Sequence, residues 1–350
     1  MSAPVPPRRS PAPTAATVAP ANEGPLWERV VGQVPAVTLL RRALAAGRVA
    51  HAYAFVGPSG VGRRLTALAF AQAMLCPAGG CGACLACRRV GAGQHPDLLL
   101  LAPTPPKDNP RGTPSLRITE VRELEHWAGL TPLEGRAKIF ILDEADRLTE
   151  QAAEALLKTL EEPPAHTHIV LIVANPRALP PTVLSRCQVV RFRPLPEADI
   201  VVLLTARGTD PESAAVLAGL CRGQVGRALE MDLADVQARR AAALALLAVP
   251  RPALAGRLDE AAPDRGRVAA ALETYWLWYR DALCLAAGAE AARLVNGDRR
   301  DDVLALARRV PLDALTSALG TIKEAHLALE ANVSPRLVLE HALLALAPAA

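Results

Sequence analysis

The sequence predicts a parallel α/β sheet with helices on both faces, followed by a small helical domain and a further all-α domain. Two observations predict this class. Short apolar runs alternate with helical patterns as far as Pro194, which is typical of a parallel sheet, and the pattern is helical only beyond it. The composition is 51% apolar and only 3% aromatic, which favours helices packed through small side chains.

The bulk properties exclude some classes of function. The net charge of +4 gives no case for DNA binding by total charge alone, although local basic patches remain possible. No apolar run approaches the roughly 18 residues of a membrane span, and the first residues lack a secretory signal pattern. We therefore expect a cytoplasmic protein, in which the seven cysteines are metal ligands or buried thiols rather than disulfides.

The chain begins with a stretch that is rich in Pro and Ala. Residues 1–24 carry too few large apolar side chains to bury, so we predict a disordered tail. Folding is expected to begin near Leu26. The next helix is amphipathic, with Val37, Leu40 and Leu44 on one side.

A strand-like run, Ala52–Val56, leads into the Gly-rich stretch around which the first domain is organised. This stretch has the frame of a phosphate-binding loop, G-x-x-x-x-G-K-[ST], and a helical pattern follows it. Arg63 stands where the motif needs lysine, and Arg64 stands where it needs a hydroxyl. The glycines of the motif are therefore present, but the lysine that contacts the β/γ-phosphates and the hydroxyl that binds Mg²⁺ are absent from it. The candidate phosphate-contacting residues are Gly57, Gly60, Gly62, Arg63 and Arg64.

Four cysteines follow the next helix within twelve residues. They include two overlapping C-x-x-C pairs and lie in a Gly-containing segment, residues 76–87, which is typical of a closed tetrahedral zinc site. The candidate ligands are Cys76, Cys81, Cys84 and Cys87. Free thiols, a redox pair or an iron–sulfur cluster are the alternatives. His95 lies nearby but is not needed, because four thiolates complete the set.

Further strands and helices alternate after the cysteines. Leu98–Leu101 and Lys138–Leu142 read as buried strands, residues 103–115 as an exposed loop, and Ile118–Trp127 as a helix. Asp143, Glu144 and Asp146 follow the second of these strands. In a working NTPase the first Asp holds Mg²⁺ and the Glu polarises water. A solvated acidic turn is the alternative, but the Gly-rich loop upstream favours a nucleotide site.

The remaining chain completes the sheet and then becomes helical. We predict a helix over 152–160, strands over 168–174 and 189–192, and helices over 195–245 and 266–350, with a linker at 250–263. The aromatic run at 274–279 could be a stacking platform for bases, but core packing is the favoured interpretation.

The order of these motifs resembles the clamp-loader AAA+ family, whose members include subunits of the bacterial DNA polymerase III clamp loader. The resemblance is strong over residues 26–245 and looser beyond. The residues that carry it are Val31-Gly32-Gln33, His51-Ala52-Tyr53, the Gly57–Arg64 loop, the four cysteines, Asp143-Glu144-Ala145-Asp146, Leu156–Pro163 and Ser185-Arg186-Cys187.

Within that family the chain is similar to the delta-prime subunits rather than to the ATP-hydrolysing gamma/tau subunits. Its phosphate loop is incomplete, and Ala174 stands at the family's sensor 1 position. The resemblance assigns Arg186 a catalytic role in trans, at a neighbouring subunit's ATP. Arg227 matches the sensor 2 position and is expected to keep only a packing role. Asp143, Glu144 and Asp146 would be vestiges of a nucleotide site that is empty of ATP, paired with Arg63 or Arg64.

The resemblance implies an AAA+ domain over 25–194, a helical lid over 195–248 and a helical collar over 249–350. It implies a non-hydrolysing stator that assembles with gamma/tau and delta, binds structural Zn²⁺, and acts indirectly on the sliding clamp and primed DNA.

Three other interpretations stay open. The chain could be a gamma/tau-like ATPase with a variant loop, or an AAA+ adaptor outside replication. It could also be a DNA-binding module that uses the cysteine segment and basic residues such as Arg88, Arg89, Arg191 and Arg193.

Overall fold

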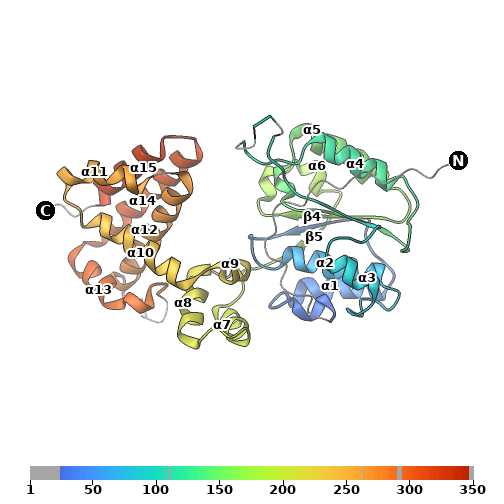
Figure 1. Cartoon of the computed structure of the whole chain (residues 1–350), viewed down its shortest axis with the longest axis horizontal. Coiled ribbons are helices and arrows are strands. Elements are labelled where there is room, and N and C mark those ends of the chain that lie inside the picture. The colour runs from blue at the N-terminus through green and yellow to red at the C-terminus, as the bar shows by residue number, and fades with distance from the viewer. Residues whose placement is uncertain (1–23, 107, 110–111, 263, 290–293, 347–350) are drawn as a thin grey trace. The chain divides into compact units, whose positions relative to one another are not determined.

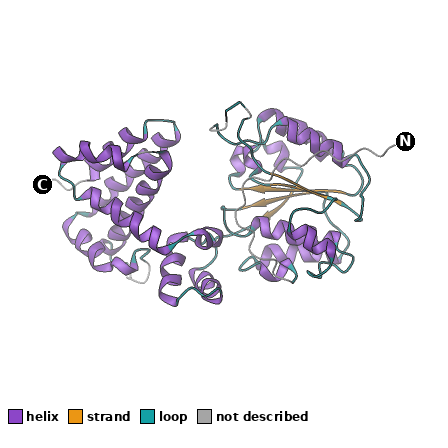
Figure 2. Cartoon of the chain, viewed as in Figure 1, coloured by secondary structure: helices purple, strands orange, loops and turns teal. Residues whose placement is uncertain are grey.

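The computed structural model describes residues 24–106, 108–109, 112–262, 264–289 and 294–346. The predicted tail falls almost wholly outside these residues. The chain divides into two compact units, one ending at Pro194 and the other beginning at Leu195. All of the described strands lie in the first unit, and the second is built from helices (Figure 2).

The first unit holds one five-stranded sheet in the order β2-β3-β4-β1-β5, and every neighbouring pair is parallel. Its elements are η1 (Leu26–Arg29), α1 (Val34–Ala45), β1 (Ala52–Val56), α2 (Arg63–Leu75), α3 (Leu85–Gly91), β2 (Leu98–Leu101), α4 (Ile118–Ala128), β3 (Lys138–Leu142), η2 (Ala145–Arg147), α5 (Glu150–Glu161), β4 (Thr167–Val173), η3 (Pro176–Ala178), α6 (Pro181–Leu184) and β5 (Gln188–Arg191).

Helices cover both faces of this sheet. Helices α1, α2 and α3 lie on one face, and α4, α5 and α6 lie on the other (Figure 1). The central strands β1, β3 and β4 are almost wholly buried, as expected for a parallel sheet covered on both faces. The predicted fold class is confirmed, and the five predicted strands agree with the observed ones to within one residue at each end.

The second unit contains α7 (Glu197–Ala206), α8 (Pro211–Cys221), α9 (Val225–Glu230), α10 (Leu233–Leu247), α11 (Arg251–Ala261), α12 (Arg265–Ala286), η5 (Gly297–Arg299), α13 (Arg300–Arg309), α14 (Leu312–Glu330) and α15 (Pro335–Leu346). The aromatic run lies in α12. Tyr275, Trp278 and Tyr279 are buried in the core of α10–α15, so the packing interpretation of this run holds.

The predicted linker in the second unit is wrong, and the packing of α10 bears on the predicted boundary between lid and collar, which stays a prediction. The predicted linker at 250–263 forms α11, because Pro252 lies in the first turn, where proline is tolerated, and Leu254 and Leu258 enter the core. Helix α10 falls in the predicted lid, yet Ala243 packs in the C-terminal core and its carbonyl accepts the Tyr275 hydroxyl at 2.9 Å. By packing, α10 belongs with the helices that follow it.

Among the described residues, none of the helices combines the length and the apolar character that crossing a membrane requires.

Candidate functional site

The Gly-rich loop joins the end of β1 to the start of α2, at the carboxyl edge of the sheet where α/β proteins place ligands. Gly57 is fixed by its neighbour. A Cβ atom at this position would lie 2.5 Å from the Phe192 carbonyl oxygen, so only glycine lets the loop pass β5 at this distance. Packing against Phe192 is therefore by itself a sufficient reason for glycine at position 57, whether or not the loop binds phosphate.

Gly62 turns the chain into α2. Its φ of +94° is left-handed, which favours glycine, and Arg63 is the first helical residue. The Thr66 hydroxyl donates to the Gly62 carbonyl at 2.9 Å. This strand–turn–helix is the context in which a phosphate loop is expected.

Gln33 binds the loop through its side-chain amide, a role that its place in Val31-Gly32-Gln33 did not predict. Its amide nitrogen donates to the carbonyls of Val61, at 3.2 Å, and Arg193, at 2.7 Å. Its amide oxygen accepts the Arg193 N–H at 3.2 Å. Gln33 is only 3% exposed, so these bonds tie the loop to the chain that leaves β5.

The two arginines of the loop behave differently. Arg63 is buried, and its Nη1 has no hydrogen-bond partner among the described residues. Burial lowers the pKa of Arg63, while the carboxylates of Asp143, Asp146 and Glu144 act in the opposite direction. Arg64 is exposed, and its Nη1 lies 3.2 Å from Asp143 Oδ2. Of the two expected pairings, the direct ion pair is therefore made by Arg64.

The acidic residues after β3 are each engaged within the chain. Asp143 pairs with Arg64, and Glu144 pairs with Arg147 at 2.7 Å. Asp146 accepts the backbone N–H of Ala174 at 2.9 Å through Oδ1. A guanidinium thus contacts the carboxylate that would hold Mg²⁺ in an NTPase.

Arg186 lies just after α6 and contacts other groups than these carboxylates. Its Nη1 donates to the Thr182 carbonyl at 2.9 Å, and its Nη2 lies 2.6 Å from Glu161 Oε1. The side chain is 36% exposed. The neighbouring Cys187 is buried, which raises the pKa of its thiol to about 12, so this thiol packs as a neutral group.

Arg227 in α9 forms a two-point ion pair with Glu273 of α12, at 2.5 and 2.7 Å. This pair raises the pKa of Arg227 above its usual value. The sequence offered no partner for Arg227, because Glu273 is distant along the chain and only packing brings α9 to α12.

The four cysteines meet at the C-terminal end of α2. Their sulfur atoms all lie within 4.8 Å of one another. Cys76 Sγ lies 3.8 Å from Cys81 Sγ and 3.7 Å from Cys84 Sγ, and the sulfurs of Cys81 and Cys87 are 3.9 Å apart. A tetrahedron with Zn–S bonds of about 2.3 Å requires S···S distances of about 3.8 Å, so the residues fit zinc.

Backbone N–H groups near the cysteines donate hydrogen bonds to the cysteine sulfur atoms. The N–H of Gly82 donates to Cys87 Sγ at 3.2 Å, and the N–H of Cys87 donates to Cys84 Sγ at 3.4 Å. Burial by itself would raise the pKa of Cys76, but hydrogen bonds from neighbouring backbone N–H groups together lower it to about 6. Such bonds favour the thiolate form that binds metal.

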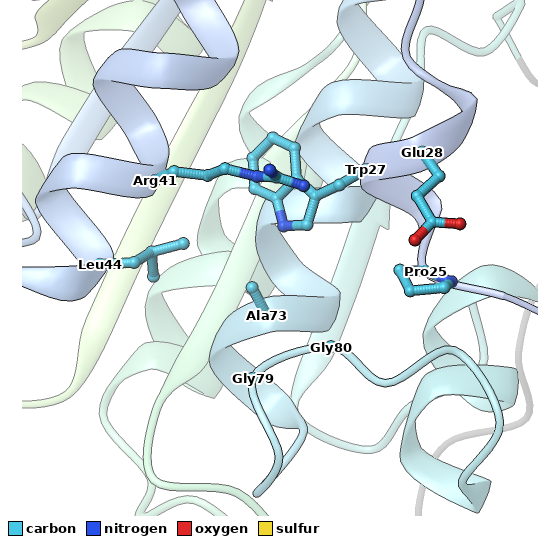
Figure 3. Close-up of a pocket in the computed structure, with 8 residues that line it drawn as sticks. All are labelled: Pro25, Trp27, Glu28, Arg41, Leu44, Ala73, Gly79 and Gly80. Atoms are coloured by element: carbon cyan, nitrogen blue, oxygen red, sulfur yellow. The ribbon is translucent and has the colours of Figure 1, made fainter.

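Gln72 connects the cysteine segment to the start of the fold. Its side-chain oxygen accepts the N–H of Leu26 at 2.9 Å, and its nitrogen donates to the Cys87 carbonyl at 3.4 Å. The same region has a shallow pocket, shown in Figure 3, where the Arg41 guanidinium lies 5.5 Å from the centre of the Trp27 ring. The pocket holds none of the predicted site residues.

Fold and site together define a parallel α/β protein with a Gly-rich loop at the carboxyl edge of its sheet and a four-cysteine cluster that fits a metal ion. Comparison with known proteins makes the assignment narrower. Residues 32–196 match the family described as DNA polymerase III, delta subunit, and residues 264–347 match the family described as DNA polymerase III, delta subunit, C terminal.

Three relatives illustrate the similarity. The delta-prime subunit of DNA polymerase III from Bacillus subtilis is 31% identical over 332 residues, which cover 91% of this chain and 98% of that protein. The Escherichia coli delta-prime subunit is 33% identical and covers 79% and 82%. The Escherichia coli tau subunit is 36% identical, over 45% of this chain and 24% of that protein.

The chain therefore belongs to the family of DNA polymerase III delta-prime subunits, the clamp-loader subunits related to gamma/tau.

Proposed function

We propose that this chain is the non-hydrolysing stator of a DNA polymerase III clamp loader. The observation that carries the proposal is the state of the loop: Arg64 is ion-paired with Asp143, and Arg63 is buried where the motif needs lysine. Phosphoryl transfer depends on positioning and charge stabilisation, and a guanidinium beside Asp143 opposes Mg²⁺ binding there. Gly57, Gly60 and Gly62 then serve the strand–turn–helix packing, and ATP is not bound.

We assign the catalytic contribution of the chain to Arg186. An arginine supplied in trans offsets the charge that develops on the γ-phosphate. Arg186 is partly exposed, and among the described residues its ion pair is with Glu161 and not with the carboxylates after β3, which supports a role at a neighbour's ATP site rather than at its own. That neighbour would be a gamma/tau subunit.

Cys76, Cys81, Cys84 and Cys87 would hold a structural zinc ion, which has no open coordination position when all four ligands are protein thiolates. Residues 25–194 would form the AAA+ domain and the C-terminal helices the collar. The helix packing favours a boundary between lid and collar near Asp232, rather than at residue 248. Delta would be the second direct partner, the clamp and primed DNA indirect ones, and the cytoplasm the location.

The proposal is tested by Arg186→Ala in a loader reconstituted from this chain with gamma/tau and delta. Arginines supplied in trans to GTPases are worth about 10³–10⁵ in rate, so we expect clamp- and DNA-stimulated turnover at the completed site to fall by more than about tenfold. Arg122→Ala, an exposed arginine of α4, is the matched control. Assembly, followed by size-exclusion chromatography, should be intact. An unchanged rate would remove the assignment.

The rival function, an active gamma/tau-like ATPase, is tested on the isolated chain. We expect no measurable binding of fluorescent ATP with or without Mg²⁺. Tight ATP binding with Mg²⁺-dependent hydrolysis would contradict the stator proposal and support the gamma/tau-like ATPase.

A further inference from the structure

The guanidinium of Arg186 is held by the carboxylate of Glu161, a residue of the Leu156–Pro163 motif for which the sequence indicates no role. Glu161 Oε1 lies 2.6 Å from Arg186 Nη2, while the Thr182 carbonyl accepts from Nη1 at 2.9 Å. We infer that Glu161 is the positioning residue that sets the plane in which Arg186 meets a neighbour's phosphate. This inference rests on the trans-arginine role of Arg186 in the proposed function.

Both partners of Arg186 lie on fixed elements. Glu161 is the last residue of α5, and Pro163-Pro164 follows, which cannot continue the helix. Thr182 lies in α6, which packs against α5. A cation is also favoured near a helix C-terminus, because the last carbonyls carry partial negative charge. The end of α5 therefore attracts the Arg186 guanidinium through Glu161 and through its own dipole.

The contacts leave donors for a ligand. A guanidinium has five N–H groups in one plane. In the described part of the chain, Arg186 contacts Thr182, Ser185 and Glu161 through Nη1 and Nη2, and none of these bonds uses Nε. The contacts of Nη1 and Nη2 thus set the plane of the guanidinium, while the Nε–H stays available for a phosphate oxygen. Planar, two-point recognition of phosphate is the property that distinguishes Arg from Lys.

The ion pair between Arg186 and Glu161 is too weak to matter much for folding, so its effect on the position of Arg186 can be tested separately from protein stability. The side chains of Arg186 and Glu161 are 36% and 52% exposed. An exposed pair of this kind contributes at most about 1 kcal/mol to folding. Removal of the carboxylate should therefore change the orientation of Arg186 without unfolding the protein, which makes the inference accessible to kinetics.

Glu162 provides a matched control. It is the next residue, it is also exposed, and within the described chain it makes no bond to Arg186. Glu161→Gln and Glu162→Gln remove the same charge from adjacent positions. An effect of net charge on ATP affinity would appear in both variants, whereas a positioning effect would appear only in the first.

The experiment measures stimulated ATPase kinetics in the reconstituted loader. Misplacement of a catalytic group by about 1 Å can cost 10²-fold in rate, and Glu161→Gln keeps the Thr182 contact, so we expect a smaller fall in kcat of about three- to tenfold. The KM for ATP and the Tm should match those of Glu162→Gln. Equal kcat values for the two variants, or a higher kcat for Glu161→Gln, overturn the inference.

The double variant Glu161→Gln/Arg186→Ala shows whether Glu161 acts through Arg186. We expect its rate to equal that of Arg186→Ala alone, and a further fall would overturn the positioning role. The two hypotheses fail in different ways. If Arg186→Ala lowers the rate and Glu161→Gln does not, only the inference about Glu161 is lost. If Arg186→Ala leaves the rate unchanged, the proposed function itself is lost.

Discussion

The two ends of α2 carry side chains whose charged forms the helix dipole disfavours, and the two ends differ in what can offset those charges. Arg63 and Arg64 stand at the N-terminal end, where the dipole favours anions, and Cys76 begins a cluster of thiols at the C-terminal end, where it favours cations. At the first end, carboxylates from the end of β3 supply the opposite charge. At the second end, a bound zinc ion would supply it.

This difference indicates why the loop can keep its shape without a ligand. The acidic residues that would hold Mg²⁺ in an NTPase here offset arginines of the same chain. Within the described chain, the last turn of α2 contains no basic residue that could offset thiolates at this end of the helix. We therefore expect the C-terminal end of α2 to depend on a ligand and the N-terminal end to depend on internal contacts.

The largest effect is expected at the cysteine end. Cys87→Ser should abolish zinc binding, because Cys87 is a buried candidate ligand and two backbone-to-sulfur bonds order this segment. Loss of a structural metal removes folding free energy directly, so we expect a fall of several degrees in Tm and faster hydrogen exchange over residues 76–91. Metal content is measured by mass spectrometry.

Cys284→Ser in α12 is the control for this substitution, since Cys284 lies outside the cluster. It should leave the zinc content and the Tm unchanged. Full zinc occupancy in Cys87→Ser would contradict the four-thiolate site.

An intermediate effect is expected where Gln33 holds the loop. Gln33→Ala removes three hydrogen bonds and takes the side-chain donor away from the buried Val61 carbonyl, so we expect a loss of about 2 kcal/mol in the free energy of unfolding. Urea denaturation measures it. Gln151→Ala, at an exposed position of α5, should change stability little. Equal stability of the two variants would mean that internal contacts do not hold the loop.

The smallest effect is expected for the ion pair at the N-terminal end of α2. Arg64→Glu places like charges opposite each other, but the Arg64 side chain is 61% exposed, so the cost should be within about 1 kcal/mol and should shrink at high salt. The double swap Arg64→Glu/Asp143→Arg should recover part of it. A loss that the swap does not recover would show that Arg64 acts through contacts other than Asp143.

Sequence patterns predicted the strands well because a buried parallel strand is a short apolar run between breakers, and its signal is local. The helix that starts at Arg251 was missed for the opposite reason. Its apolar positions, Leu254 and Leu258, are few, and Pro252 looks like a breaker until it is placed in a first turn. The sequence pattern also did not reveal that α10 packs in the C-terminal core. Its contacts there are with α12, which is separated from it in the chain by α11.

The sequence by itself determined the residue types at each site: the incomplete phosphate loop, the four cysteines at ligand spacing, and the arginine before Cys187. Each of these features can be recognised from residue types and their spacing within a short stretch of the chain. Only the tertiary structure decided which groups meet across the chain. The bonds of Gln33 to the loop, of Asp143 to Arg64, and of Glu161 to Arg186 join residues from different elements, and the packing of the sheet and its helices brings them together.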